Sequence, residues 1–381
     1  MKRIIEFCKK EVVLCIAGLL AIASMLIVIP DKKYLAYPDY RVLALLFCLM
    51  AIMEGFKQTG LFGRLAGALL SKVKDFRQLY LVLVLLCFFS SMWITNDVAL
   101  ITFVPFAIEL LKMAGLKDKI IKVVVLQTIA ANLGSMFTPI GNPQNLYLYN
   151  LTGMSIGRFL LLMLPLSAVS CLLLFGLIWL EKPVLLTADL PETNGMIDVK
   201  HTVIYGVLFF ACLLTVVRIL PFPIMLGIVV VGILAVNRGL FAKVDYCLLG
   251  TFLGFFVFVG NMENIPAVKQ LLESLLSGRE LLVSVLASQV ISNVPAAMLL
   301  AGFTTQYEAL LYGVNIGGLG TLIASLASVI SYKAYGAEAN AKKGKYMLVF
   351  TVYNLLFLAV LLILGFLLAY ALNYKFLRGR T

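Results

Sequence analysis

The chain has 381 residues, of which 62% are apolar and 13% charged, with a formal net charge of +12. Soluble domains are about 45–50% apolar and about 25% charged, so this chain lacks the polar side chains that a soluble surface needs. Composition therefore excludes a soluble enzyme, a nucleic-acid-binding protein and a disordered chain. It predicts an all-α polytopic membrane protein.

The first half of the chain contains long apolar runs and shorter ones that polar residues interrupt. Spanning helices are expected at residues 12–29, 40–56 and 156–180, with an amphipathic stretch at 61–73. The runs 79–94 and 98–111 are shorter than the roughly 20 residues of a span. Thr95-Asn96-Asp97 separates them, which predicts a re-entrant helical hairpin with its tip at 95–97. The run 120–149 predicts a transmembrane helix broken at 138–145.

The second half repeats this order after a hydrophilic stretch at 181–201. Expected in turn are spans at 202–220, 224–236 and 246–259, an amphipathic stretch at 265–276, a second hairpin with its tip at 292–295, a second broken helix at 310–331 and a last span at 346–370. Local sequence agrees, because Asn132, Gly134 and Thr138 have the same spacing as Asn315, Gly317 and Thr321. The pattern predicts nine crossings, two hairpins and an internal repeat.

The predicted division of the chain follows from this repeat. It comprises an N-terminal transmembrane helix (1–38), a first repeat (39–180), a cytoplasmic linker (181–201), two connecting transmembrane helices (202–244), a second repeat (245–373, helix break at 317–328) and a C-terminal tail (374–381).

The excess of Lys and Arg is interpreted as a topology signal. With the N-terminus in the cytoplasm and the C-terminus outside, the cytoplasmic segments hold roughly twice as many basic residues as the opposite side, in agreement with the positive-inside rule. No nucleic-acid partner is implied; the expected location is a bacterial-type plasma membrane. On this topology the two repeats enter from opposite sides, and inverted repeats with broken helices are typical of secondary transporters.

Polar residues gather at the two hairpin tips and the two helix breaks. Irregular backbone inside a membrane is tolerated only against protein or a watery cavity. Helix N-termini there favour anions, while free carbonyl and side-chain oxygens suit small cations. Asp97 is the acid expected at a tip, as a cation ligand, a proton carrier or a helix N-cap. The candidate site residues are Thr95, Asn96, Asp97, Thr138, Pro139, Gly141, Asn142 and Asn145 in the first repeat and Ser292, Asn293, Val294, Thr321, Ala324 and Ser325 in the second.

The motifs Thr95-Asn96-Asp97, Ser292-Asn293-Val294-Pro295 and Gly141-Asn142-Pro143-Gln144-Asn145 resemble those of the ion transporter superfamily. This superfamily includes divalent anion/sodium symporters, citrate carriers, arsenite permeases and some sodium/proton antiporters. The resemblance implies one sodium site at Thr95, Asn96 and Gly141 and another at Ser292, Asn293 and Ala324. It also implies a homodimer and an elevator movement of a transport domain against a scaffold.

Two departures from that pattern widen the choice of function. Asp97 and Val294 stand where the symporters have a tip threonine, so neither carboxylate-binding hydroxyl is present. The leading hypothesis is transport of a small anion, a carboxylate or an inorganic oxyanion, coupled to Na⁺ or H⁺, with no other cofactor. The alternatives are a cation/proton antiporter or arsenite-type efflux permease and, more distantly, an intramembrane enzyme. The enzyme lacks support because the sequence shows neither an HExxH motif nor a facing pair of acids.

Overall fold

The computed structural model describes residues 11–70, 73–185 and 197–378, and these form helices joined by short connections. The helices of the first half are α2 (Val12–Met25), η1 (Lys32–Ala36), α3 (Tyr40–Gln58), α4 (Leu61–Leu70), α5 (Phe76–Ile94), α6 (Asn96–Met113), η2 (Lys117–Lys119), α7 (Ile120–Ser135), α8 (Pro143–Thr152) and α9 (Ile156–Trp179). Those of the second half are α10 (Val199–Val216), α11 (Phe222–Asn237), η3 (Arg238–Lys243), α12 (Tyr246–Glu263), α13 (Pro266–Leu276), α14 (Glu280–Ile291), α15 (Asn293–Ala301), α16 (Tyr307–Ile316), α17 (Leu326–Gly336) and α18 (Lys343–Arg378).

Six helices of the described chain are long and apolar enough to cross a membrane: α5, α9, α10, α11 with η3, α12 and α18. A seventh span is counted if α13 and α14, which meet at 109°, are taken together. This is fewer than the nine expected crossings. Four of the expected crossings are not among these six: α2 has only 14 residues, α3 carries the charged residues Arg41, Glu54 and Lys57, and the two broken helices are divided into α7, α8, α16 and α17, each shorter than 18 residues. Conversely, α5 has 19 residues and is long enough to cross, although residues 79–94 were expected to form only a short arm of a re-entrant hairpin.

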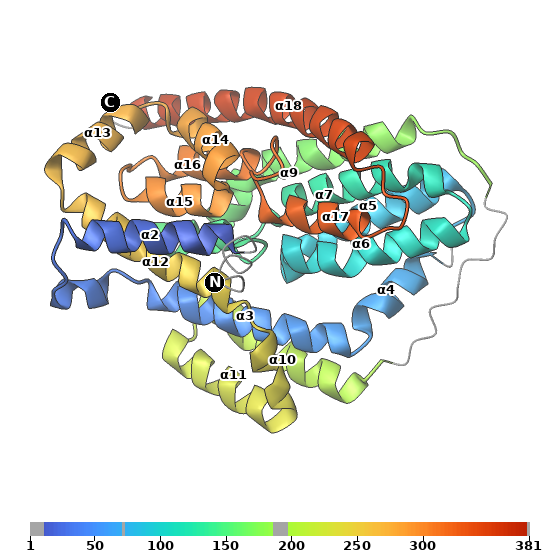
Figure 1. Cartoon of the computed structure of the whole chain (residues 1–381), viewed down its shortest axis with the longest axis horizontal. Helices are drawn as coiled ribbons and strands as arrows, with labels where there is room; N and C mark the ends of the chain where they lie inside the picture. Colours follow the sequence, from blue (N-terminus) through green and yellow to red (C-terminus); the bar gives the residue numbers. More distant parts are fainter. Residues whose placement is uncertain (1–10, 71–72, 186–196, 379–381) are drawn as a thin grey trace.

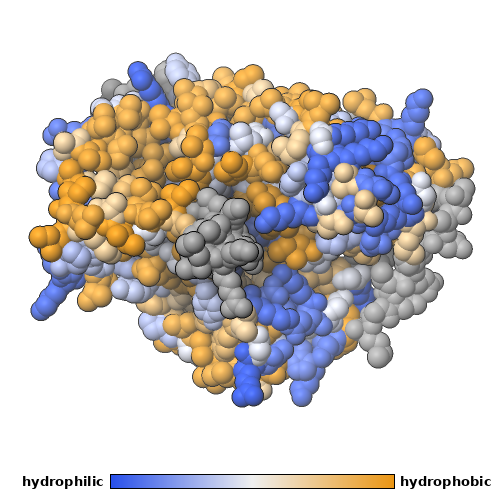
Figure 2. All heavy atoms as spheres, viewed as in Figure 1, coloured by the Kyte–Doolittle hydropathy of each residue, from blue (hydrophilic) through white to orange (hydrophobic). Residues whose placement is uncertain are grey.

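The outer surface of the helix assembly is apolar where a lipid phase would contact it. The long helix α18 exposes Leu348, Val352 and Ile363, and α9 exposes Leu161 and Leu172. Figure 2 shows this apolar surface over α18 and the neighbouring α14, with hydrophilic residues gathered over the far end of α17. Exposed leucine and isoleucine in such numbers suit a bilayer rather than water. The chain is a multi-pass integral membrane protein.

The two hairpins and the first halves of the two broken helices form two groups of helices (Figure 1). Figure 1 shows α14, α15 and α16 at one end and α5, α6 and α7 at the other, beneath the long α18. The second halves of the broken helices cross between these groups, because α8 packs on α15 and α16, whereas α17 packs on α6 and α7. Each hairpin therefore contacts the broken helix that the other half of the sequence supplies.

Side-chain caps fix where several helices begin. Asp39 and Asp245 precede α3 and α12, and each carboxylate accepts a hydrogen bond from the backbone N–H three residues on, at 3.0 Å and 2.9 Å. Asn142 caps α8 in the same way, accepting from the backbone N–H of Asn145. An N-cap satisfies one of the unpaired donors of the first helical turn. Helices α3 and α12 therefore begin with the same kind of cap.

The breaks are close to the predicted positions. The first irregular segment, residues 136–142 (the first break), separates α7 from α8, and the second, residues 317–325 (the second break), separates α16 from α17. Helix α18 continues to Arg378, beyond residue 373, where the second repeat was expected to end. Residues 186–196 of the expected linker and 379–381 of the expected tail lie outside the described residues.

Glycine allows close packing between each hairpin and its broken helix. A Cβ atom on Gly134 would lie 1.9 Å from the carbonyl oxygen of Phe88 and 2.6 Å from Ser91 Oγ. At the corresponding Gly317, a Cβ would lie 2.7 Å from Ser288 Oγ. Both contacts join a buried serine of a hairpin arm to a broken helix.

We expect Gly134→Ala to destabilise the protein, because the clash is with backbone that cannot rotate away. Overpacking of this kind costs about 1–3 kcal/mol, measurable as a lower midpoint of thermal unfolding in detergent. Gly176→Ala in α9 is the matched control, since a Cβ there meets nothing within 4 Å. The control should match or slightly exceed wild-type stability. Equal stability of the two variants would contradict the close approach of α5 and α7.

Candidate functional site

Both hairpin tips contain one residue in a rare backbone conformation. Thr95 has φ 69° and ψ 153°, and Ser292 has φ 74° and ψ 154°. This region is essentially reserved for glycine and costs on the order of 1–3 kcal/mol for other residues. The two tips therefore adopt the same strained turn, and strain of this kind concentrates at ligand sites and switch regions.

The strained turns point a backbone N–H at each break. The N–H of Asn96 donates to the carbonyl oxygen of Gly141 at 3.1 Å, and the N–H of Asn293 donates to that of Ala324 at 2.9 Å. Side-chain hydrogen bonds also correspond between the two halves. The Thr138 hydroxyl donates to the carbonyl oxygen of Met92. The Thr321 hydroxyl donates to that of Gln289 at 3.0 Å. Met92 and Gln289 each precede their tip residue by three positions.

Two buried asparagines connect the breaks to each other. Asn315 accepts from the amide of Asn142 at 3.2 Å and donates to Asn145 Oδ1 at 2.7 Å. Asn132 accepts from the hydroxyl of Ser325 at 3.0 Å. The start of α8 is therefore bonded to α16, and the start of α17 is bonded to α7. Asn132 also accepts from the amide of Asn96 at 3.1 Å, which extends the network to the first tip.

The structure brings the predicted residues of each half together. In the first half, Pro139 is buried in the break, and the Asn145 amide donates to the carbonyls of Met136 and Thr138 at 3.0 and 3.1 Å. In the second half the packing is less favourable to a role in binding. Val294 is 8% exposed among apolar neighbours, while Thr321 faces outward.

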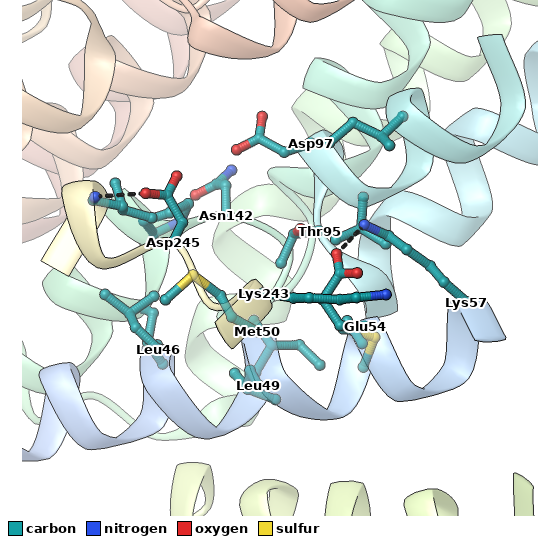
Figure 3. Close-up of a pocket in the computed structure, with 17 residues that line it drawn as sticks. Leu46, Leu49, Met50, Glu54, Lys57, Thr95, Asp97, Asn142, Lys243 and Asp245 are labelled. Carbon is teal, nitrogen blue, oxygen red and sulfur yellow. Dashed lines mark hydrogen bonds and ion pairs between the residues drawn. The ribbon is translucent and has the colours of Figure 1, made fainter. Parts of the chain in front are cut away.

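A cavity of about 200 Å³ lies against the first tip and the first break. Thr95, Asp97 and Asn142 line it, and Figure 3 shows the Asp97 carboxylate on the side of Asn142 and Asp245. The second tip does not contribute to this cavity. This cavity is therefore lined by residues of the first predicted set and not by residues of the second.

Four charged residues of this cavity were not among the candidates. Glu54 and Lys57 come from α3, Lys243 ends η3, and Asp245 precedes α12. Glu54 and Lys57 form an ion pair within the wall, and Lys243 and Asp245 lie at the exposed rim. The spacing of Glu54 and Lys57 in the sequence could have indicated their position. They continue one helical face that begins with Leu46, Leu49, Met50 and Met53.

The groups around the two tips that could coordinate a cation are oxygen atoms. Among the described residues, no group of three His, Cys, Asp or Glu side chains could hold a metal ion. Around the tips, the oxygens on offer are backbone carbonyls, such as those of Gly141 and Ala324, together with serine, threonine and asparagine side chains. Oxygen ligands of this type suit hard cations.

Long apolar helices, hairpins with polar tips and interrupted helices that meet inside the molecule define a secondary transporter. A family model described as citrate transporter matches residues 4–307. The chain belongs to this citrate transporter family, and it is not an enzyme.

Individual relatives support this assignment. An uncharacterised transporter of Methanocaldococcus jannaschii is 31% identical over 85% of this chain and 88% of its own length. The inner membrane protein YbiR of Escherichia coli is 30% identical over 81% of this chain and 84% of its own. A silicon efflux transporter of Oryza sativa is 32% identical over 43% of this chain and 35% of its own.

Proposed function

We propose that this transporter moves a small anion, a carboxylate or an inorganic oxyanion, coupled to H⁺ or Na⁺. In this proposal residues 39–180 and 245–373 are inverted repeats. Their hairpins and broken helices form a transport domain that moves against α3 and α10–α12, as in an elevator, within a homodimer. The cavity beside Asp97 is the solute site.

The observation that carries the proposal is the matched pair of tip-to-break bonds, Asn96 to Gly141 and Asn293 to Ala324. Breaks of this kind bring helix N-termini and backbone carbonyls together inside a membrane, which is where secondary transporters bind solute and coupling ion. The family match supports an anion as the solute.

The charges of the cavity explain why such an anion needs a coupling ion. Its lining holds three acids, Glu54, Asp97 and Asp245, and two lysines, Lys57 and Lys243. An anion would add negative charge to a site that already has an excess of it, which is costly at low dielectric constant. Within the described structure, the Asp97 carboxylate has no hydrogen-bond or ion-pair partner, whereas Glu54 is paired with Lys57 and Asp245 caps α12. Asp97 is therefore the group on which a proton or a sodium ion would offset the charge of the anion.

A transport assay tests the proposal. Purified protein in proteoliposomes is given labelled citrate, succinate, phosphate or arsenate, with a pH gradient, a sodium gradient or neither imposed. We expect at least one anion to accumulate, and the pH gradient or the sodium gradient to increase its accumulation severalfold. Liposomes without protein should show no accumulation. Absence of flux for every anion under every gradient would contradict an anion transporter.

The excess of acids also supports a second candidate, cation/proton exchange, in which Asp97 binds a cation and a proton in turn. The same proteoliposomes distinguish the two candidates. Exchange would appear as acidification or alkalinisation of the lumen on addition of Na⁺ or K⁺ without any anion from the panel. Efflux of a metalloid oxyanion, as the name of the rice relative indicates for silicon, would appear as loss of preloaded silicate or arsenite.

A further inference from the structure

We infer that Lys57, with Lys243 at the rim, binds the anionic group of the solute, and that Glu54 competes with the solute for Lys57. The inference rests on the proposed function, because it names the groups that recognise the anion in the same cavity. It assigns recognition to α3 and η3 rather than to the hairpin tips.

The position of Lys57 follows from the register of α3. Leu46, Met50 and Met53 line the cavity at intervals of three or four residues, which places them on one helical face. Glu54 and Lys57 continue that face at its end. The side chains of Lys57 and Glu54 are only 19% and 23% exposed, so this pair is held in the wall of the cavity rather than in open solvent.

Among the described residues that line the cavity, positive charge comes only from this side. The first tip presents an acid, Asp97, which repels an anion, and Asp245 lies on the same side in Figure 3. Lys57 and Lys243 are the two cations of the lining. In Figure 3 the amino group of Lys243 lies on the Glu54 and Lys57 side, away from the Asp97 carboxylate. Lys57, Lys243 and Glu54 together carry a net charge of +1, and they lie opposite Asp97 and Asp245 (Figure 3).

The ion pair with Lys57 makes Glu54 a competitor of the solute. An ammonium group has three donors and no acceptor, and one carboxylate can replace another on it without loss of charge attraction. A solute anion can therefore take the place of the Glu54 carboxylate on Lys57, while Lys243 remains to balance Glu54. The pair would then favour solutes whose anionic oxygens bind Lys57 better than a tethered carboxylate does.

Substitutions on both sides of the pair test this assignment. For the panel anion that the wild-type protein carries fastest, we expect Lys57→Gln to raise KM at least tenfold with a smaller change in maximal rate. Lys57→Arg should restore most of the affinity, because it returns the charge. Glu54→Gln should lower KM about threefold, because it removes the competitor.

The matched control is the Glu109–Lys112 pair on α6, which has the same spacing of three residues and lies outside the cavity. Glu109→Gln should leave KM unchanged, and thermal unfolding would confirm that every variant is folded. If the wild-type protein carries an anion but Lys57→Gln keeps its KM, or if Glu54→Gln raises KM as much as Lys57→Gln does, the assignment of Lys57 is wrong. If the wild-type protein carries no anion of the panel, the proposed function is wrong and this assignment with it.

Discussion

Replacing Asp97 by asparagine is expected to abolish concentrative uptake while leaving exchange of the solute across the membrane measurable. The amide is neutral and cannot bind a proton at physiological pH, so the cavity would accept the anion without a coupling ion. We expect gradient-driven accumulation in proteoliposomes to fall at least tenfold. Counterflow, in which external label exchanges with an internal pool, should persist and become independent of pH and sodium.

The control for this experiment is Asp39→Asn. Asp39 caps α3, does not line the cavity, and loses little as a cap when changed to asparagine. It should retain accumulation and its dependence on the gradient. An Asp97→Asn protein whose flux keeps the wild-type response to pH and to sodium would exclude Asp97 from coupling.

Asn315→Leu is expected to cause the largest loss of stability among single changes at the breaks. Asn315 is 3% exposed, and its removal leaves Asn145 Oδ1 and the amide of Asn142 each without one partner. A buried group deprived of its partner costs about 1–3 kcal/mol. We expect a clear drop in the midpoint of thermal unfolding in detergent and loss of flux, because this side chain joins α16 to the start of α8.

Asn354→Leu provides a control of the same chemistry. Asn354 is also fully buried, but it bonds only to the carbonyl of Phe350 in its own helix, and its side-chain oxygen has no partner in the described structure. Leucine there removes only a second hydrogen bond to a helical carbonyl, which keeps its backbone hydrogen bond. Stability should therefore change by less than about 1 kcal/mol. Similar losses in the two variants would show that the network between the breaks contributes nothing special.

The sequence predicted the local features of this fold well. The polar interruptions in the apolar runs lie within a few residues of the ends of the helices at both tips and both breaks, because unpaired backbone cannot lie in hydrocarbon without polar help. The spacing of Asn132 to Thr138 and of Asn315 to Thr321 indicated two related broken helices. The structure then gives the two segments matching bonds to their hairpins.

The contacts between the two halves could not be predicted from the same patterns. Nothing local to Asn315 shows that its partners are Asn142 and Asn145, some 170 residues away. The charged wall of the cavity was missed for a related reason. Glu54 and Lys57 near the end of a helix look like residues that reach water. They line an enclosed cavity because η3 packs on α3 and the first tip lies on the other side of the cavity.

The tip-to-break bonds have a consequence for how the membrane barrier could open. Asn96 and Asn293 donate their main-chain N–H groups to carbonyl oxygens of the breaks. A hairpin that moved away from its break alone would therefore leave an N–H group and a carbonyl group unpaired in a medium without water. Each hairpin and the helix it touches are therefore expected to travel as one stiff piece. Slow exchange of these two amide hydrogens, unaffected by solute, would be the spectroscopic signature of a carrier whose hinges lie outside its binding region.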